Sequence, residues 1–217
     1  IGSSALLLLN PATATDTLNT AVGYHAGRGV TTGVKNVLVG GLAGDAFTTG
    51  SDNVALGYNA LTADTLGSRS TALGRSTLQN QNFTTATNAY NVAIGYAAGD
   101  AVTTGIDNVL IGALAGDALT DADKNVAIGK SALSSDTLGS KSVAVGQGTL
   151  NVQNFTTATD SFNVAVGHQA GASVTTGIQN TLIGGLAGDA LTDADYNVAV
   201  GAYALSSDTL GSQSVAV

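Results

Sequence analysis

The sequence predicts an all-β solenoid, a chain wound into stacked coils, and two observations carry this prediction. A five-residue phrase, Asn-Val-Ala-Ile-Gly with small variations, recurs every 17 residues along most of the chain. The composition favours strands and tight turns over helices, because there are 29 Gly, no Met and no Glu among the 217 residues. Fixed self-similarity at this scale is typical of solenoids and fibres rather than of globular enzymes.

The repeats are grouped into a larger unit of 72 residues, made of three steps of 17 and one step of 21. Residues 1–72, 73–144 and 145–216 are three such superperiods. We call each repeat a rung and number its positions from the Asn or Ser that opens the phrase. Residues 1–217 are therefore predicted to form one continuous array, and the matched phase of its ends suggests a section of a longer fibre protein.

A representative rung, residues 91–107, shows how each element is expected to form. Positions 1 to 5 read as a strand in which Val92 and Ile94 face one way and the intervening residues face the other. No copy carries a charge at these five positions, so both faces are expected to be buried, as in parallel sheets covered on both sides. A turn at positions 5 to 10 and a second strand at positions 11 to 15, with Thr at position 13, complete the predicted coil.

The thinness of such a coil predicts association with other chains. Two strands cannot cover both faces of the first strand, so its second face is expected to meet other copies around a rotational axis. Stacked rungs would place like residues above like at ~4.8 Å, the spacing between neighbouring strands.

Composition and charge exclude several classes of function. The net charge of -8 and the scattered placement of the seven Lys and Arg argue against a nucleic-acid or anionic-membrane partner. The longest apolar stretch near the start, residues 5–9, is too short for membrane insertion. Disorder is not expected, because 44% of the residues are hydrophobic and only 10% are charged.

The repeated phrase resembles two related groups of extracellular proteins. Residues 91–95, 125–129, 163–167 and 197–201 resemble the head repeats of YadA-like trimeric autotransporter adhesins. Residues 19–27 and 91–99 are similar to repeats of phage tail-fibre proteins. The resemblance implies a left-handed parallel β-roll, a homotrimer, and an extracellular, cell-surface or virion tail-fibre location. The longer rung and the regular 21-residue insertion depart from the adhesin pattern.

The expected function is that of a non-enzymatic structural and adhesive fibre segment, the shaft or head of a tail fibre, surface adhesin or extracellular filament. The alternative is a module that binds glycans or receptors through the loops of the 21-residue rungs. Its candidate contacts are Asn82, Phe83, Thr84, Asn154, Phe155 and Thr156. Each Phe either lies exposed among amides and hydroxyls, where it could contact a carbohydrate, or packs beneath its loop as an apolar anchor. The two loops differ little, which favours a spacer.

The remaining polar residues predict no catalytic site and no cofactor. His25 and His168 occupy different rung positions, and neither has a nucleophile or acid that repeats with it. The paired Asp121 and Asp123, with Asp193 and Asp195 one superperiod later, could hold Ca²⁺ but fit no known calcium-loop pattern, so solvated turns are preferred. The Asn ladder at position 1 is interpreted as amide stacking at turns, and the Thr ladder at position 13 as part of a half-buried strand rather than an ice-binding array.

Overall fold

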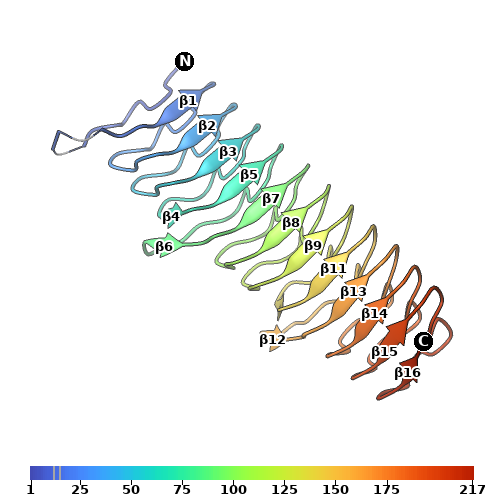
Figure 1. Cartoon of the computed structure of the whole chain (residues 1–217). Helices are drawn as coiled ribbons and strands as arrows, with labels where there is room; N and C mark the ends of the chain where they lie inside the picture. The colour runs from blue at the N-terminus through green and yellow to red at the C-terminus, as the bar shows by residue number, and fades with distance from the viewer. Residues whose placement is uncertain (12, 15) are drawn as a thin grey trace.

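The structure is a computed structural model and describes residues 1–11, 13–14 and 16–217. The described residues contain no helix, and twelve short strands form one parallel sheet in chain order. Figure 1 shows this sheet running the length of a rod, with one coil of chain returning behind each strand. The predicted all-β parallel solenoid is therefore confirmed.

The strands of the long sheet comprise the middle residues of each five-residue phrase. They are β1 (Thr20–Val22), β2 (Val37–Val39), β3 (Val54–Leu56), β5 (Thr71–Leu73), β7 (Val92–Ile94), β8 (Val109–Ile111), β9 (Val126–Ile128), β11 (Val143–Val145), β13 (Val164–Val166), β14 (Thr181–Ile183), β15 (Val198–Val200) and β16 (Val215–Ala216). Two further pairs occur only beside the 21-residue rungs: β4 (Gly67–Ser68) with β6 (Thr87–Asn88), and β10 (Gly139–Ser140) with β12 (Thr159–Asp160).

The register of the sheet follows the repeat. Val92 pairs with Val109, 17 residues later, whereas Thr71 pairs with Val92 across a 21-residue rung. The four additional residues are therefore accommodated outside the sheet, and like positions remain stacked from β1 to β16. Figure 1 shows the longer rungs extending beside the rod at β6 and β12.

The predicted second strand at positions 11 to 15 is wrong as a regular strand. In most 17-residue rungs this segment is a series of bends, and only β4 and β10 place a strand residue at position 15, because the chain must turn back on itself within about a dozen residues. Its rungs are nevertheless stacked in register: the Thr103 amide donates to the Thr120 carbonyl at 2.9 Å, and the Thr103 hydroxyl donates to the same oxygen at 3.2 Å. The Thr ladder therefore ties rungs together through its hydroxyls.

The two faces of the main strands differ within one chain, as the thinness of the coil predicts. Ala93 is fully buried inside the coil, whereas Ile94 is 37% exposed on the outside. The same alternation holds in the other strands of the sheet, where the middle residue is the most buried. One chain thus covers only the inward face of its sheet.

The interior of the coil explains why the repeat has a superperiod of four rungs. Leu replaces Ala at position 3 only in the second rung of each superperiod, and Gly stands at position 9 of that rung. A Cβ on Gly116 would lie 2.7 Å from Cδ2 of Leu110, so the large residue fits only because its neighbour has no side chain. Position 3 reads Ala, Leu, Ala, Ala and position 9 reads Gly, Gly, Leu, Leu over the four rungs, which therefore make one packing unit.

The Asn ladder lies in the interior of the rod, not at its surface turns. The amide N–H of Asn108 donates to Oδ1 of Asn91 at 2.9 Å, and Nδ2 of Asn108 donates to the Ala122 carbonyl at 2.8 Å. Both Asn side chains are fully buried. Each side chain therefore connects its own rung to the next and also closes its own coil, as buried polar groups require.

Candidate interaction surface

The outward face of the long sheet carries a continuous column of aliphatic side chains. Positions 2 and 4 of every rung hold Val, Ile, Leu or occasionally Thr, and one strand follows the next without interruption. The exposed members include Val22, Val37, Leu56, Ile94, Val166, Ile183 and Val200. We call this feature the aliphatic column. Large contiguous apolar patches are typical of interaction surfaces.

Two rows of residues border the aliphatic column. One row consists of the residue immediately before each rung-opening Asn or Ser, position 17, and the other of the residue immediately after each Gly, position 6. We call them the entry rim and the exit rim. Six of the seven Lys and Arg lie on these rims: Lys35, Arg69, Lys124 and Lys141 on the entry rim, and Arg75 and Lys130 on the exit rim.

This placement corrects the interpretation of the cations as scattered. Only two of the 15 Asp residues, Asp52 and Asp107, lie on the rims. The seventh cation, Arg28, lies elsewhere on the coil and pairs with Asp45 at 3.7 Å. An acidic protein therefore has one face whose rims are net positive, a segregation that becomes visible only when the rungs are aligned by register.

The rims are also aromatic. Tyr24, Tyr58 and Tyr96 lie exposed on the exit rim, and Tyr90, Phe162 and Tyr196 lie exposed on the entry rim. Cations of one rung stack on rings of the next: the Arg69 guanidinium lies 5.5 Å from the Tyr90 ring centre, and the Lys141 ammonium lies 5.1 Å from that of Phe162. Such contacts hold the long side chains against the surface.

The combination of an aliphatic centre with Arg- and Tyr-rich edges is the anatomy of a protein–protein interface. Interface cores are depleted in charge, and Tyr, Phe and Arg are the residues most enriched at binding surfaces. The described residues enclose no pocket.

The loops of the 21-residue rungs present hydroxyls and amides but not their rings. Phe83 and Phe155 are only 4% and 6% exposed, so each packs beneath its loop. Asn82, Thr84, Asn154 and Thr156 are exposed. Oδ1 of Asn82 already accepts from the Thr65 hydroxyl at 3.0 Å, and the same contact links Asn154 to Thr137. The predicted ligand surface is thus reduced to polar groups at the loop tips.

A buried polar layer, which sequence reasoning missed, lies beneath each of these loops. Oδ2 of Asp64 accepts from Nε2 of Gln81 at 2.6 Å, and Oδ1 accepts from the Gly67 amide at 2.9 Å. Gln81 Nε2 also donates to the Ser70 hydroxyl at 3.1 Å, and Gln81 Oε1 accepts from Asn91 at 2.9 Å. The sequence contains a signal for this layer at position 12. This position is Val in the first rung of a superperiod, Phe or Leu in the second, Asp in the third and Gln in the fourth.

The same layer recurs one superperiod later around Asp136 and Gln153, whose contact is 2.5 Å. Burial raises the pKa of Asp64 and of Asp136 above the ordinary value for Asp, although hydrogen bonds from the Gln side chains and from backbone amides oppose this effect. No ion pair compensates either carboxylate among the described residues.

These buried carboxylates predict that the protein is more stable in mild acid than at neutral pH. Because their pKa is raised on folding, the folded chain binds more protons than the unfolded chain between the unfolded value, 3.8, and the raised folded value. Stability should therefore fall as pH rises through this window. Urea unfolding at pH 4.5 and pH 7 measures the difference.

The double variant Asp64→Asn Asp136→Asn should lose much of this pH dependence. Asp121→Asn Asp193→Asn, which removes two exposed carboxylates, serves as the matched control. Wild-type protein that loses stability on acidification over this range would contradict the assignment.

The paired Asp residues considered for Ca²⁺ already have partners within the chain. Asp121 accepts from the Thr104 hydroxyl, and Asp123 Oδ1 accepts from the Ile106 amide at 2.8 Å. Asp193 and Asp195 repeat these contacts with Thr176 and Ile178. Among the described residues, no group of three or more His, Cys, Asp or Glu could hold a metal ion. These residues therefore act as links between rungs.

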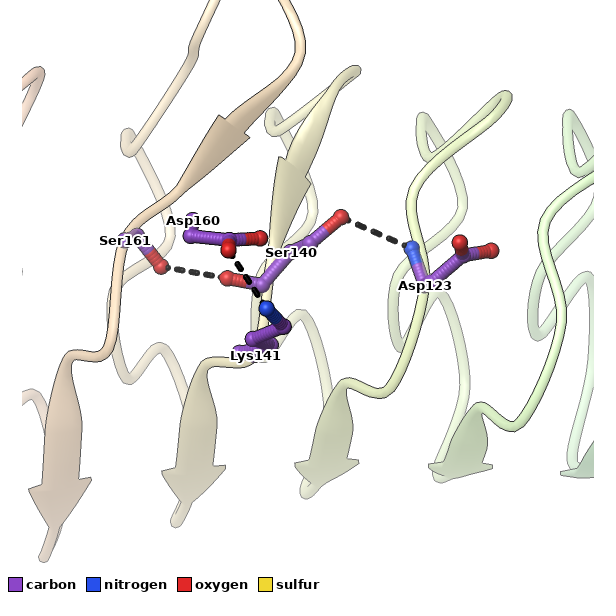
Figure 2. A network of polar contacts seen from close by, with 5 residues as sticks. All are labelled: Asp123, Ser140, Lys141, Asp160 and Ser161. Atoms are coloured by element: carbon purple, nitrogen blue, oxygen red, sulfur yellow. Dashed lines mark hydrogen bonds and ion pairs between the residues drawn. The ribbon is translucent and has the colours of Figure 1, made fainter.

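Figure 2 shows how such links continue towards the second long rung. The Asp123 amide donates to the Ser140 hydroxyl at 2.9 Å, and Ser161 donates to the Ser140 carbonyl at 3.0 Å. Lys141 and Asp160 form an ion pair beside them. The entry rim is thus fastened to the loop where the rung lengthens.

The structure places the two histidines in different surroundings. His25 stacks on Tyr24, with ring centres 3.8 Å apart, and His168 lies exposed on the exit rim. The described residues also contain no helix long and apolar enough to cross a membrane.

Comparison with known proteins gives no relative. No protein-family model, no curated protein and no solved structure matches this chain.

Proposed function

We propose that this chain is a structural segment of a fibre, in which copies associate side by side through the aliphatic column. The observation that carries the proposal is the column itself: an unbroken apolar strip along all twelve strands of the sheet, bordered by cations and aromatic rings. A single chain leaves this strip in contact with water, which is unfavourable at roughly 25 cal/mol for each Å² of apolar surface.

The repeat favours another copy of the same chain as the partner. Twelve rungs at ~4.8 Å make a strip of more than 50 Å, and a partner must match that spacing over the whole length to cover it. A second copy has the same rung spacing because it has the same sequence. Rotational symmetry about the rod axis would let each copy bury its column against the others and leave no column exposed.

The proposal also includes three more detailed features that the sequence predicts. They are a homotrimer, a left-handed winding, and a place outside the cell, on a cell surface or in a virion tail fibre, with the adhesive role supplied by the fibre as a whole. The buried Phe83 and Phe155 rings favour the spacer over a carbohydrate platform. Binding of glycans by the polar loop tips remains the second candidate, supported by exposed Asn82 and Thr84 and by their exposed counterparts Asn154 and Thr156 one superperiod later.

The proposal predicts a rod-shaped oligomer that one charge can dissociate. Multi-angle light scattering should give three times the chain mass of 21.2 kDa, and small-angle X-ray scattering should give an elongated particle. Ile94→Asp places one carboxylate per chain in the column, where the copies would bring several together without partners, so the variant should be monomeric. Thr85→Asp, on an exposed loop, should remain oligomeric. A monomeric wild-type protein would overturn the proposal.

A further inference from the structure

The aliphatic column poses a problem of register for any side-by-side assembly. Its residues are nearly the same in every rung, so two copies displaced by one rung along the axis would bury almost the same apolar surface. Uniform strips specify register weakly. The rims differ from rung to rung, and they are the only part of this face that can fix the axial position of one copy against another.

Rotational symmetry determines which rims meet. When three or more parallel copies turn their columns towards a common axis, the contact is heterologous, and the exit rim of one copy lies against the entry rim of the next. Two copies would form an isologous contact, in which each exit rim again lies against the partner's entry rim. The sequences of the two rims can therefore be compared rung by rung for the three smallest displacements.

A level contact is unfavourable. It would bring Arg69, which precedes β5, against Arg75 of the partner subunit, which follows β5. Lys124 and Lys130 would meet in the same way across β9. In a second arrangement, each entry-rim residue faces the partner's exit-rim residue of the preceding rung. This arrangement brings Lys141 against the partner's Lys130. Like charges in an interface are destabilising.

The opposite displacement removes every like-charge contact. It places Asp52, beside β3, against the partner's Arg75, beside β5, and Asp107, beside β8, against the partner's Lys130, beside β9. These are the only two Asp residues on the rims, and each meets a cation.

The remaining rim residues also fit this displacement. Lys35 meets the partner's Tyr58 and Arg69 meets the partner's Tyr96, which are cation–aromatic pairs. The bulky Tyr90 and Phe162 meet the partner's Ala113 and the partner's Gly185, which leave room for the rings.

We infer that neighbouring copies meet with a stagger of one rung, the entry rim beside one strand contacting the exit rim beside the next strand of the partner, and that the pairs Asp52–Arg75 and Asp107–Lys130 set this register. A slight tilt of the strands against the common axis supplies the stagger without shifting the chains. The inference rests on the proposed side-by-side assembly, and it names the contacts by which that assembly is aligned.

The absence of Cys from the chain allows a direct test by disulfide formation. The double variant Asp107→Cys Lys130→Cys should form disulfides between copies under mild oxidation and give covalent oligomers on a non-reducing gel. Within one chain these two positions lie on opposite rims, separated by roughly 20 Å of strand, whereas a disulfide needs Cα atoms within about 7 Å. Lys124→Cys Lys130→Cys is the matched control, because it would cross-link only in a level contact.

The outcomes separate the inference from the proposed function. Efficient cross-linking of the 107/130 pair and not of the 124/130 pair supports the stagger. An oligomer that cross-links through the 124/130 pair, through both pairs equally or through neither overturns the stagger and leaves the assembly intact. Wild-type protein that is monomeric by light scattering overturns both.

Discussion

Replacing Gly184 by Ala is expected to cost at least about 3 kcal/mol of unfolding free energy, because the new methyl group meets backbone and the backbone itself is strained. A Cβ at Gly184 would lie 2.3 Å from the carbonyl oxygen of Gly201 in the next rung, and the residue has a φ of +137°. The new Cβ and the Gly201 carbonyl oxygen both belong to stacked backbone, so they can move apart only if the two rungs separate. Urea unfolding followed by circular dichroism measures the loss.

Two neighbouring glycines separate the causes of this effect. Gly201 has a φ of +133° but nothing within 4 Å of its Cβ position, so Gly201→Ala tests the backbone strain alone. Gly185 has nothing within 4 Å in its own chain and no such φ, so Gly185→Ala should change the unfolding free energy of a single chain by less than about 0.5 kcal/mol. Since each rung contacts only its neighbours, hydrogen exchange in residues 180–201 should respond first to Gly184→Ala. Equal stability of all three variants would contradict the close approach of the rungs.

Replacing Asn125 by Ala is expected to destabilise the rod by about 2–6 kcal/mol, since two buried backbone groups each lose their partner at about 1–3 kcal/mol. Asn125 Oδ1 accepts from the Ser142 amide at 2.9 Å, and Asn125 Nδ2 donates to the Gly139 carbonyl at 2.9 Å. No water can reach either group, because Asn125 is fully buried in the middle of the stack. Thermal and urea unfolding give the magnitude.

An exposed amide provides the control for this substitution. Asn88 lies at the surface of the first long rung, and Asn88→Ala should leave the unfolding free energy within about 0.5 kcal/mol of wild type. A wild-type-like Asn125→Ala protein would show that the Asn ladder is dispensable, and that backbone pairing and apolar packing hold the rungs without it.

Much of this fold is readable from the sequence because a repeat constrains every copy at once. The spacing of Asn91, Asn108 and Asn125 predicts both the coil length and the parallel register. The pairing of Val92 with Val109 and of Val109 with Val126 follows from it. The superperiod likewise predicts that the 21-residue rungs leave the stack undisturbed. Coil length and strand register follow from the period of the repeat, because every rung must stack on its neighbours in the same way.

The second half of the rung could not be read in the same way. Thr at position 13 suggested a strand, but the backbone there turns too sharply for one, and the Thr103 hydroxyl bonds to the next rung instead. The β-propensity of Thr predicted an extended strand here, and that prediction was wrong. Tertiary stacking overrides β-propensity in a coil this narrow.

The sequence by itself determined that this protein is a parallel stack of twelve rungs with an uncharged strand in each. Only the tertiary structure decided which side of that strand each coil buries, and hence that Ala93 is interior while Ile94 faces outward. It also decided that the cations and rings, which are scattered along the chain, lie in two rows beside the aliphatic column, and that Asp64 and Gln81 meet inside the coil. The reason is physical: alternation along a strand fixes two faces, but the path of the returning chain selects the one that is covered.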